Sequence, residues 1–322
     1  MKKTAVALAL SLVTGSAFAV EALSGDQFTV SGEFAVGGYS DSSETVAGRD
    51  VYNGGATGFD IFADYENGNI VGKFGGEFDI ENDYGTSQST FTITDTWVGY
   101  KTDLGVASVG YANDTALDAI DGAADQTIEF LWSPSDASDA RQVVKFEGEK
   151  EGFIYGISYF GDRNYHDENS AEPAIAQDGI NGYVGYGSDV FTVNLGYEDN
   201  GEAEGNVALD EQTDKLLIVN GTVKAGDFGV GATFGEEENA AGEKTKLVNT
   251  SVGYSMDALY LAAGYVVIEE TREAVNVGGS YAFSENLTGL VDVAYHVSDK
   301  GLVSQGIEKG DIESFVKLAY AF

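Results

Sequence analysis

The sequence ends with DIESFVKLAYAF (residues 311–322), and this stretch decides the fold. Side chains of a β-strand alternate between its two faces. One face of this stretch is mostly apolar and carries Ile312, Ser314, Val316, Leu318, Tyr320 and Phe322. The opposite face is mixed and partly charged and carries Glu313, Phe315, Lys317, Ala319 and Ala321. Such alternation over about ten residues is typical of a strand that separates lipid from a water-filled interior.

The same alternation recurs upstream. Residues 287–297 place Leu, Gly, Val and Tyr at odd positions, opposite Thr288, Asp292 and His296. Residues 275–283 and 28–36 show the same period. For residues 90–101 the sequence does not decide which face meets the lipid, because Thr and Val at even positions oppose Phe91, Ile93, Asp95 and Trp97.

Sixteen such segments are predicted along the chain. They span residues 28–39, 57–66, 69–80, 90–101, 105–112, 140–149, 152–161, 179–187, 189–199, 213–225, 227–236, 245–255, 258–268, 272–283, 287–298 and 312–322.

The connections between these segments alternate in length. Tight turns fall at residues 67–68, 102–104, 150–151, 188, 226, 256–257 and 284–285. Longer, acidic stretches fall between them at residues 40–56, 81–89, 113–139, 162–178, 200–212, 237–244 and 299–311. The one exception is residues 269–271, a short connection where the alternation predicts a long one. Short periplasmic turns and long extracellular loops are characteristic of outer-membrane barrels.

The predicted fold is therefore all-β: a transmembrane antiparallel β-barrel of sixteen strands. The sheet must close, because an open edge would leave backbone N–H and C=O groups unpaired in lipid. Sixteen strands enclose a water-filled lumen. An even number of strands also places both ends of the barrel chain on the periplasmic side.

Composition agrees with this fold and excludes several functions. The chain has 43 Gly, 18 Tyr and 18 Phe but only 2 Pro, a residue that removes a donor from a strand. It has no Cys, which excludes disulfides and a thiolate zinc site. A net charge of −36 argues against nucleic acid as a partner, because its phosphates would be repelled.

The first residues predict a secretory signal peptide over residues 1–19. Lys2 and Lys3 precede a short apolar run, and Ala17-Phe18-Ala19 fits a small-x-small cleavage site. Residues 20–322 then form one domain. Their best apolar run, residues 259–268, is too short for a transmembrane helix but fits a tilted transmembrane strand.

Three segments resemble the general porins of Gram-negative bacteria. Residues 97–110, WVGYKTDLGVASVG, resemble a strand–turn–strand of that family, and RQVVKF (141–146) with GFIYGISY (152–159) resembles the strand pair after its third loop. The final Tyr320-Ala321-Phe322 resembles the signal that the barrel assembly machinery recognises. The resemblance implies a homotrimer in which each barrel has its own pore and the third loop folds into the lumen.

The third loop would be residues 113–139, which contain no Lys or Arg. A solvated external loop is the alternative. By resemblance, the acidic side of the constriction would be Asp114, Asp118, Asp121, Asp125 and Glu129, facing a basic wall formed by Lys73, Arg141 and Lys145. An arginine common in the family after Val109-Gly110 is replaced here by Tyr111, and the family's Pro-Glu-Phe-Gly-Gly loop motif is missing. We therefore expect a pore dominated by acids and selective for cations.

The function predicted is passive diffusion of small hydrophilic solutes, without a cofactor or enzyme activity. A substrate-preferring porin, an adhesin and a barrel hydrolase are the alternatives. A hydrolase based on a Ser–His pair would need a positioned histidine, and the chain has only His166 and His296. The acidic loops are expected to contact lipopolysaccharide, with Ca²⁺ or Mg²⁺ as a possible bridge.

Overall fold

The computed structural model describes residues 27–41, 56–83, 86–131, 140–163, 177–202, 212–298 and 308–322. The predicted signal peptide and His166 lie outside these residues. Sixteen strands are present: β1 (Phe28–Asp41), β2 (Gly58–Asn67), β3 (Ile70–Asp83), β4 (Thr86–Thr102), β5 (Gly105–Ala112), β6 (Arg141–Lys150), β7 (Phe153–Phe160), β8 (Gly179–Gly187), β9 (Phe191–Asn200), β10 (Thr213–Ala225), β11 (Phe228–Asn239), β12 (Lys244–Met256), β13 (Leu259–Ile268), β14 (Arg272–Ala282), β15 (Leu287–His296) and β16 (Ile312–Ala321). No helix among the described residues is long and apolar enough to cross a membrane.

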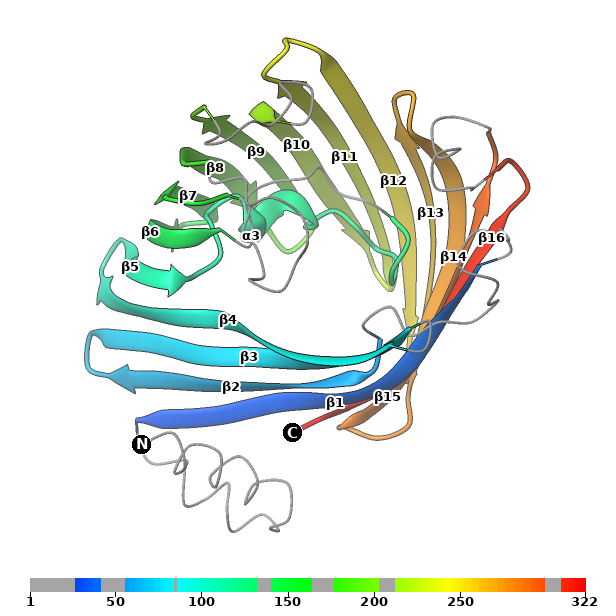
Figure 1. Cartoon of the computed structure of the whole chain (residues 1–322), viewed down its shortest axis with the longest axis horizontal. Coiled ribbons are helices and arrows are strands. Elements are labelled where there is room, and N and C mark those ends of the chain that lie inside the picture. The colour runs from blue at the N-terminus through cyan, green and yellow to red at the C-terminus, as the bar shows by residue number, and fades with distance from the viewer. Residues whose placement is uncertain are drawn as a thin grey trace.

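The strands form one closed antiparallel barrel (Figure 1). Each strand pairs with its neighbours in the sequence, and β1 pairs with β16 from Glu33 opposite Ala321 to Asp41 opposite Glu313. The predicted fold class is confirmed, and the strand limits agree with the prediction to within about four residues, the accuracy expected of such boundaries.

Two stretches predicted as long loops are largely strand. β3 and β4 leave only two residues between Asp83 and Thr86, and β11 and β12 leave only four between Asn239 and Lys244. Acidic composition suggested loops, but cross-strand ion pairs satisfy some of these charges. The Nζ of Lys244 lies 2.6 Å from Glu236 Oε1 and 3.3 Å from Glu238 Oε2. Charged residues therefore extend this hairpin instead of ending it.

The alternation of faces follows the predicted pattern. On β16, Val316 and Tyr320 are exposed on the outside of the barrel, whereas Phe315 and Ala319 are buried inside. On β15, Val291 is exposed and Asp292 is fully buried. The apolar face therefore points to lipid and the mixed face points to the lumen.

A β-bulge explains why the phase of β4 was ambiguous. Gly75 of β3 lies opposite Asp95, but Glu77 lies opposite Thr92, so β4 has one extra residue between these pairs. An extra residue reverses the side-chain alternation beyond it. The exposed residues are accordingly Phe91 and Ile93 before the bulge and Val98 and Tyr100 after it.

The seam between β1 and β16 is closed by the last residue. Phe322 and Gly32 exchange backbone hydrogen bonds, with N···O distances of 3.0 and 3.2 Å. The Phe322 ring lies 5.5 Å from the ring of Phe34, and a side chain at Gly32 would collide with it. Glycine at position 32 thus makes room for the terminal ring.

The seam gives a first prediction. Phe322→Ala removes the ring contact with Phe34, and we expect it to lower the free energy of unfolding by about 1–2 kcal/mol. The measurement is reversible urea unfolding of protein refolded into lipid vesicles, where no assembly machinery acts. Tyr295→Ala on β15 is the control, because its side chain is an equally exposed aromatic of the outer surface that lies outside the β1–β16 seam. An equal loss in both variants would contradict a specific role of Phe322 in the seam.

Candidate functional site

Residues 113–131, which follow β5, lie inside the barrel. They include the short helix α3 (Asp118–Asp121), which Figure 1 shows within the ring of strands. Leu117 and Ile120 form a fully buried cluster with Leu216 and Ile218 of β10. Residues 113–131, the described part of the loop, are therefore packed on the inner wall and not extended into solvent.

Glycines on the inner wall make room for this loop. They lie on every second strand, so that loop side chains, and at Gly231 the loop backbone, can approach the sheet closely. A Cβ at any of them would meet an atom of the loop. We call these four residues the glycine track: Gly156 of β7, Gly196 of β9, Gly231 of β11 and Gly264 of β13.

Polar side chains on the intervening strands bind the loop backbone. Asn181 of β8 accepts a hydrogen bond from the Leu117 amide at 3.4 Å. The side-chain amide of Asn220 on β10 donates to the Ile120 carbonyl. The Ser251 Oγ on β12 accepts from the Gln126 amide at 2.9 Å. Glycines and hydrogen-bonding side chains thus alternate along the wall.

A buried carboxylate holds the far part of the loop. Asp292 of β15 is fully buried, and its Oδ2 accepts hydrogen bonds from the backbone amides of Ile128, Glu129 and Phe130 at 3.3, 2.9 and 3.4 Å. The Asn276 side-chain amide donates to the same oxygen at 3.1 Å. Hydrogen bonds to a charged acceptor are stronger than neutral ones, so this contact fixes residues 128–130 on the wall.

The alternation of residues 287–297 predicts that Asp292 lies on the lumen face, but it does not predict the anchoring role. The only signal was an ionisable residue on a strand whose other face is apolar. Its partners are backbone amides about 160 residues away in the chain, which no local pattern shows.

The predicted acidic residues all lie on this seated loop. Asp114, Asp118 and Asp121 are partly buried, whereas Glu129 is exposed and accepts a 2.6 Å hydrogen bond from the Tyr39 hydroxyl. Their role in a constriction stays a prediction.

Asp125 is a partly buried carboxyl of the loop. Burial raises its pKa above the ordinary range, although hydrogen bonds from the amide and hydroxyl of Thr127 partly oppose this effect. The nearby Asp292 carboxylate adds to the increase in the pKa. Asp125 therefore takes up a proton at a higher pH than an ordinary aspartate.

The two predicted wall lysines lie on the inner face of β3 and β6. The Nζ of Lys73 is 3.0 Å from Asp95 Oδ2 and 4.5 Å from the centre of the Phe62 ring. The Nζ of Lys145 is 3.0 Å from Glu147 Oε2. Each positive charge is thus locally balanced by a carboxylate of the same wall.

Arg141 is buried in the wall at only 6% exposure. Its Nη1 donates to the Ile93 carbonyl at 2.9 Å, and its guanidinium lies 5.4 Å from the centre of the Tyr111 ring. Tyr111, the residue that departs from the family pattern, is therefore a cation–π partner of Arg141. This placement gives Arg141 a structural role in joining β6 to β4 and β5.

The wall near the seam also carries carboxylates. Glu33, Asp60 and Glu77 occupy directly paired positions on β1, β2 and β3. The Nζ of Lys317 lies 2.7 Å from Glu33 Oε1. The sequence alone does not predict this row, because its members become neighbours only through the strand register. The wall that would face the acidic loop is thus mixed in charge and not uniformly basic.

His296 does not form a Ser–His pair in the described structure. It is 2% exposed, and its Nε2 lies 2.6 Å from Glu313 Oε2, which also accepts a 2.9 Å hydrogen bond from Arg272 Nη2. This buried cluster links β14, β15 and β16. Among the described residues, no group of three or more His, Asp or Glu side chains is placed to hold a metal ion.

The sequence model of one family, described as Gram-negative porin, matches residues 4–301. The chain belongs to the Gram-negative porin family. This porin is an integral β-barrel of the outer membrane, and its family and fold are those of a channel. No sequence among curated proteins matches it significantly.

Solved structures show the same fold at low sequence identity. OmpF of Salmonella typhi, in a complex with daunomycin, is 17% identical with a TM-score of 0.73, covering 92% of this chain and 97% of that one. In vitro folded OmpT of Vibrio cholerae, in its trimer form, is 17% identical with a TM-score of 0.63, covering 92% and 100%. A mutant of the Rhodopseudomonas blastica porin is 15% identical with a TM-score of 0.61, covering 92% and 100%.

The anchor at Asp292 gives a second prediction. Asp292→Asn weakens the acceptor of three backbone amides, at a cost of about 1–3 kcal/mol, and we expect residues 128–130 to leave the wall. Single-channel recording should then show a changed conductance and increased noise in the open state. Asp79→Asn on β3 is the matched control, because it removes the same charge outside the strands that seat the loop. Identical changes in both variants would show that charge, and not anchoring, is responsible.

Proposed function

We propose that this porin is a passive diffusion channel for small hydrophilic solutes and ions that prefers cations, and that residues 113–139 narrow its lumen. The observation that carries the proposal is the seating of the loop along the glycine track. Residues 113–131 occupy part of the lumen, and both their backbone and their apolar side chains contact the wall.

Charge supports the preference for cations. The loop brings Asp114, Asp118, Asp121, Asp125 and Glu129 into the barrel without any basic residue, and the facing wall contributes further carboxylates. Rings of acidic side chains favour cations in a channel, and low-dielectric walls focus the field of such charges. Lys73 and Lys145 each have a carboxylate partner, so they offset this field only locally.

Neutralising the loop gives the third prediction. In the triple variant Asp118→Asn, Asp121→Asn and Asp125→Asn, we expect the ratio of K⁺ to Cl⁻ permeability to fall several-fold toward unity, because three negative charges leave the lumen. The measurement is the reversal potential of single channels under a KCl gradient.

A matched triple variant controls for net charge. Glu236→Gln, Glu238→Gln and Glu243→Gln remove as much charge from the β11–β12 hairpin. We expect this variant to keep most of the wild-type permeability ratio. A wild-type channel without cation preference would overturn the proposed selectivity, and folded protein without conductance would overturn the diffusion channel itself.

The porin is further proposed to form a homotrimer, and the outer surface supports an association between copies. Phenylalanine rings form a continuous row across neighbouring strands. The ring centres are 5.5 Å apart for Phe322 and Phe34, 5.4 Å for Phe34 and Phe59, and 6.2 Å for Phe59 and Phe78. Phe91 continues the row opposite Phe78.

Other outward aromatic residues are arranged differently. Phe228 and Tyr254 lie near strand ends at a ring distance of 4.5 Å, whereas Tyr197 and Phe234 lie within β9 and β11. Aromatic residues at strand ends suit the membrane–water interface. A row of rings that crosses five strands suits a rigid protein partner, and OmpT of Vibrio cholerae is described in a trimer form. Lipopolysaccharide and the barrel assembly machinery remain proposed partners.

The aromatic row gives the fourth prediction. The triple variant Phe34→Leu, Phe59→Leu and Phe78→Leu keeps an apolar surface but loses the rings, and we expect its trimer to dissociate at a lower temperature. Analytical ultracentrifugation and native gels in detergent measure this change. The control replaces Phe153, Tyr186 and Phe228, which lie near the tight turns, by Leu. Unchanged trimer stability in the first variant would place the interface elsewhere.

A further inference from the structure

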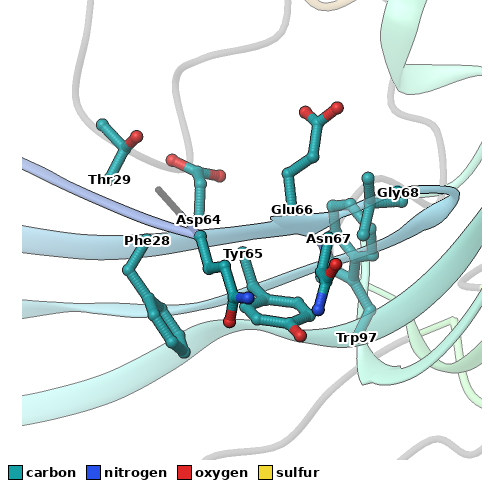
Figure 2. A pocket seen from close by; sticks show the side chains of 11 residues that line it. Phe28, Thr29, Asp64, Tyr65, Glu66, Asn67, Gly68 and Trp97 are labelled. Atoms are coloured by element: carbon teal, nitrogen blue, oxygen red, sulfur yellow. The ribbon is translucent and has the colours of Figure 1, made fainter. Parts of the chain in front are cut away.

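A cavity of about 710 Å³ opens on the inner wall near the tight turns of β1–β4. Figure 2 shows Thr29, Asp64 and Glu66 on one side of the sheet and the rings of Phe28 and Tyr65 on the other. A second cavity of about 470 Å³ is lined by residues of β3–β8 and shares Val71 and Trp97 with the first. We call the two cavities together the Trp97 alcove.

The indole of Trp97 is held in a fixed orientation. Its Nε1 donates to Asp95 Oδ1 at 3.3 Å, which satisfies the polar atom of the ring. Asp95 is itself buried and paired with Lys73 at 3.0 Å. The apolar side chains of Val71, Val106 and Ile154 also line the alcove. Trp97 is thus a rigid aromatic surface beside aliphatic groups, facing the lumen.

The charges around the alcove leave a negative balance. Five carboxylates, those of Asp64, Glu66, Asp95, Glu147 and Glu149, stand against the three ammonium groups of Lys73, Lys101 and Lys145, so the formal charge is −2. Lys101 pairs with Glu66 at 2.7 Å, and Lys145 pairs with Glu147 at 3.0 Å. Asp64 and Glu149 have no ammonium partner among the described residues.

We infer that the Trp97 alcove is a binding subsite for small organic cations, such as ammonium compounds with methyl or other apolar substituents. This inference rests on the proposed function, because the ligand reaches the alcove through the lumen. A cation near the face of a tryptophan ring is attracted by the ring quadrupole, and tryptophan is the best of the aromatic residues for this contact. Asp64 supplies a carboxylate for the same charge.

The chemistry separates organic cations from other solutes. Apolar substituents gain contact with Val71, Val106 and Ile154, which a strongly hydrated K⁺ does not. Neutral sugars gain nothing from the negative balance, and anions are repelled by it. The alcove therefore retains organic cations for longer than either class.

Choline is a suitable probe because it is a quaternary ammonium ion that dissolves well in water. We expect choline to reduce the single-channel K⁺ current of the wild type and to raise its open-channel noise. Trp97→Ala should raise the half-blocking concentration about fivefold to tenfold, the loss expected for a cation–π contact. Trp97→Phe should be intermediate, and Asp64→Asn should weaken the block.

Phe62→Ala is the matched control. Phe62 is also an aromatic residue of the inner wall, but its ring face is already occupied by the Lys73 ammonium at 4.5 Å. We expect this variant to be blocked by choline as the wild type is. An equal loss of block in Phe62→Ala, or a full block in Trp97→Ala, would overturn the assignment.

The same recordings separate this inference from the proposed function. If the channels conduct K⁺ with a cation-selective reversal potential but show no Trp97-dependent block by choline, the proposed diffusion channel stands and the binding subsite is excluded. Folded protein without conductance excludes both. The Trp97→Phe variant keeps an aromatic ring at this position and loses only the hydrogen bond to Asp95, so it covers the case in which Trp97→Ala fails to fold.

Discussion

The requirement that every backbone N–H and C=O be paired in lipid determines the rest of this structure. Each of the sixteen strands has two antiparallel neighbours, and the pairing of β1 with β16 leaves no free edge. Because unpaired backbone groups cost several kcal/mol each in a bilayer, the barrel must be closed before it can be stable in the membrane. Closure of the barrel also separates the two faces of the sheet. The outer face contacts lipid, and the polar and charged side chains that need water lie on the inner face.

Inside the barrel, one loop and the wall are fitted to each other. The glycine track leaves room on the wall where the loop packs, and Asn181, Asn220 and Ser251 supply hydrogen bonds between the glycines. Asp292 then binds three consecutive amides. A buried carboxylate without such donors would be strongly destabilising, so the wall and the loop stabilise each other.

Much of the fold was predictable because alternation of period two is a local property. It located all sixteen strands and the lumen face of Asp292. It failed for residues 81–89 and 237–244, where cross-strand pairing, a long-range interaction, extends acidic segments as strands. It also left β4 ambiguous, since the bulge opposite Gly75–Glu77 depends on the register with β3. The burial of Arg141 beside Tyr111 and Ile93 was equally beyond reach, because these contacts join three different strands.

The glycine track has a consequence for how pores of this kind change. The wall positions that accommodate the loop are spread over β7, β9, β11 and β13, about 110 residues of sequence, so the loop is not an interchangeable module. A loop grafted from a related barrel, with bulkier residues at the points of contact, would find no room unless the wall glycines changed with it. A bulkier residue at one of these loop contacts therefore requires a compensating substitution in the sheet.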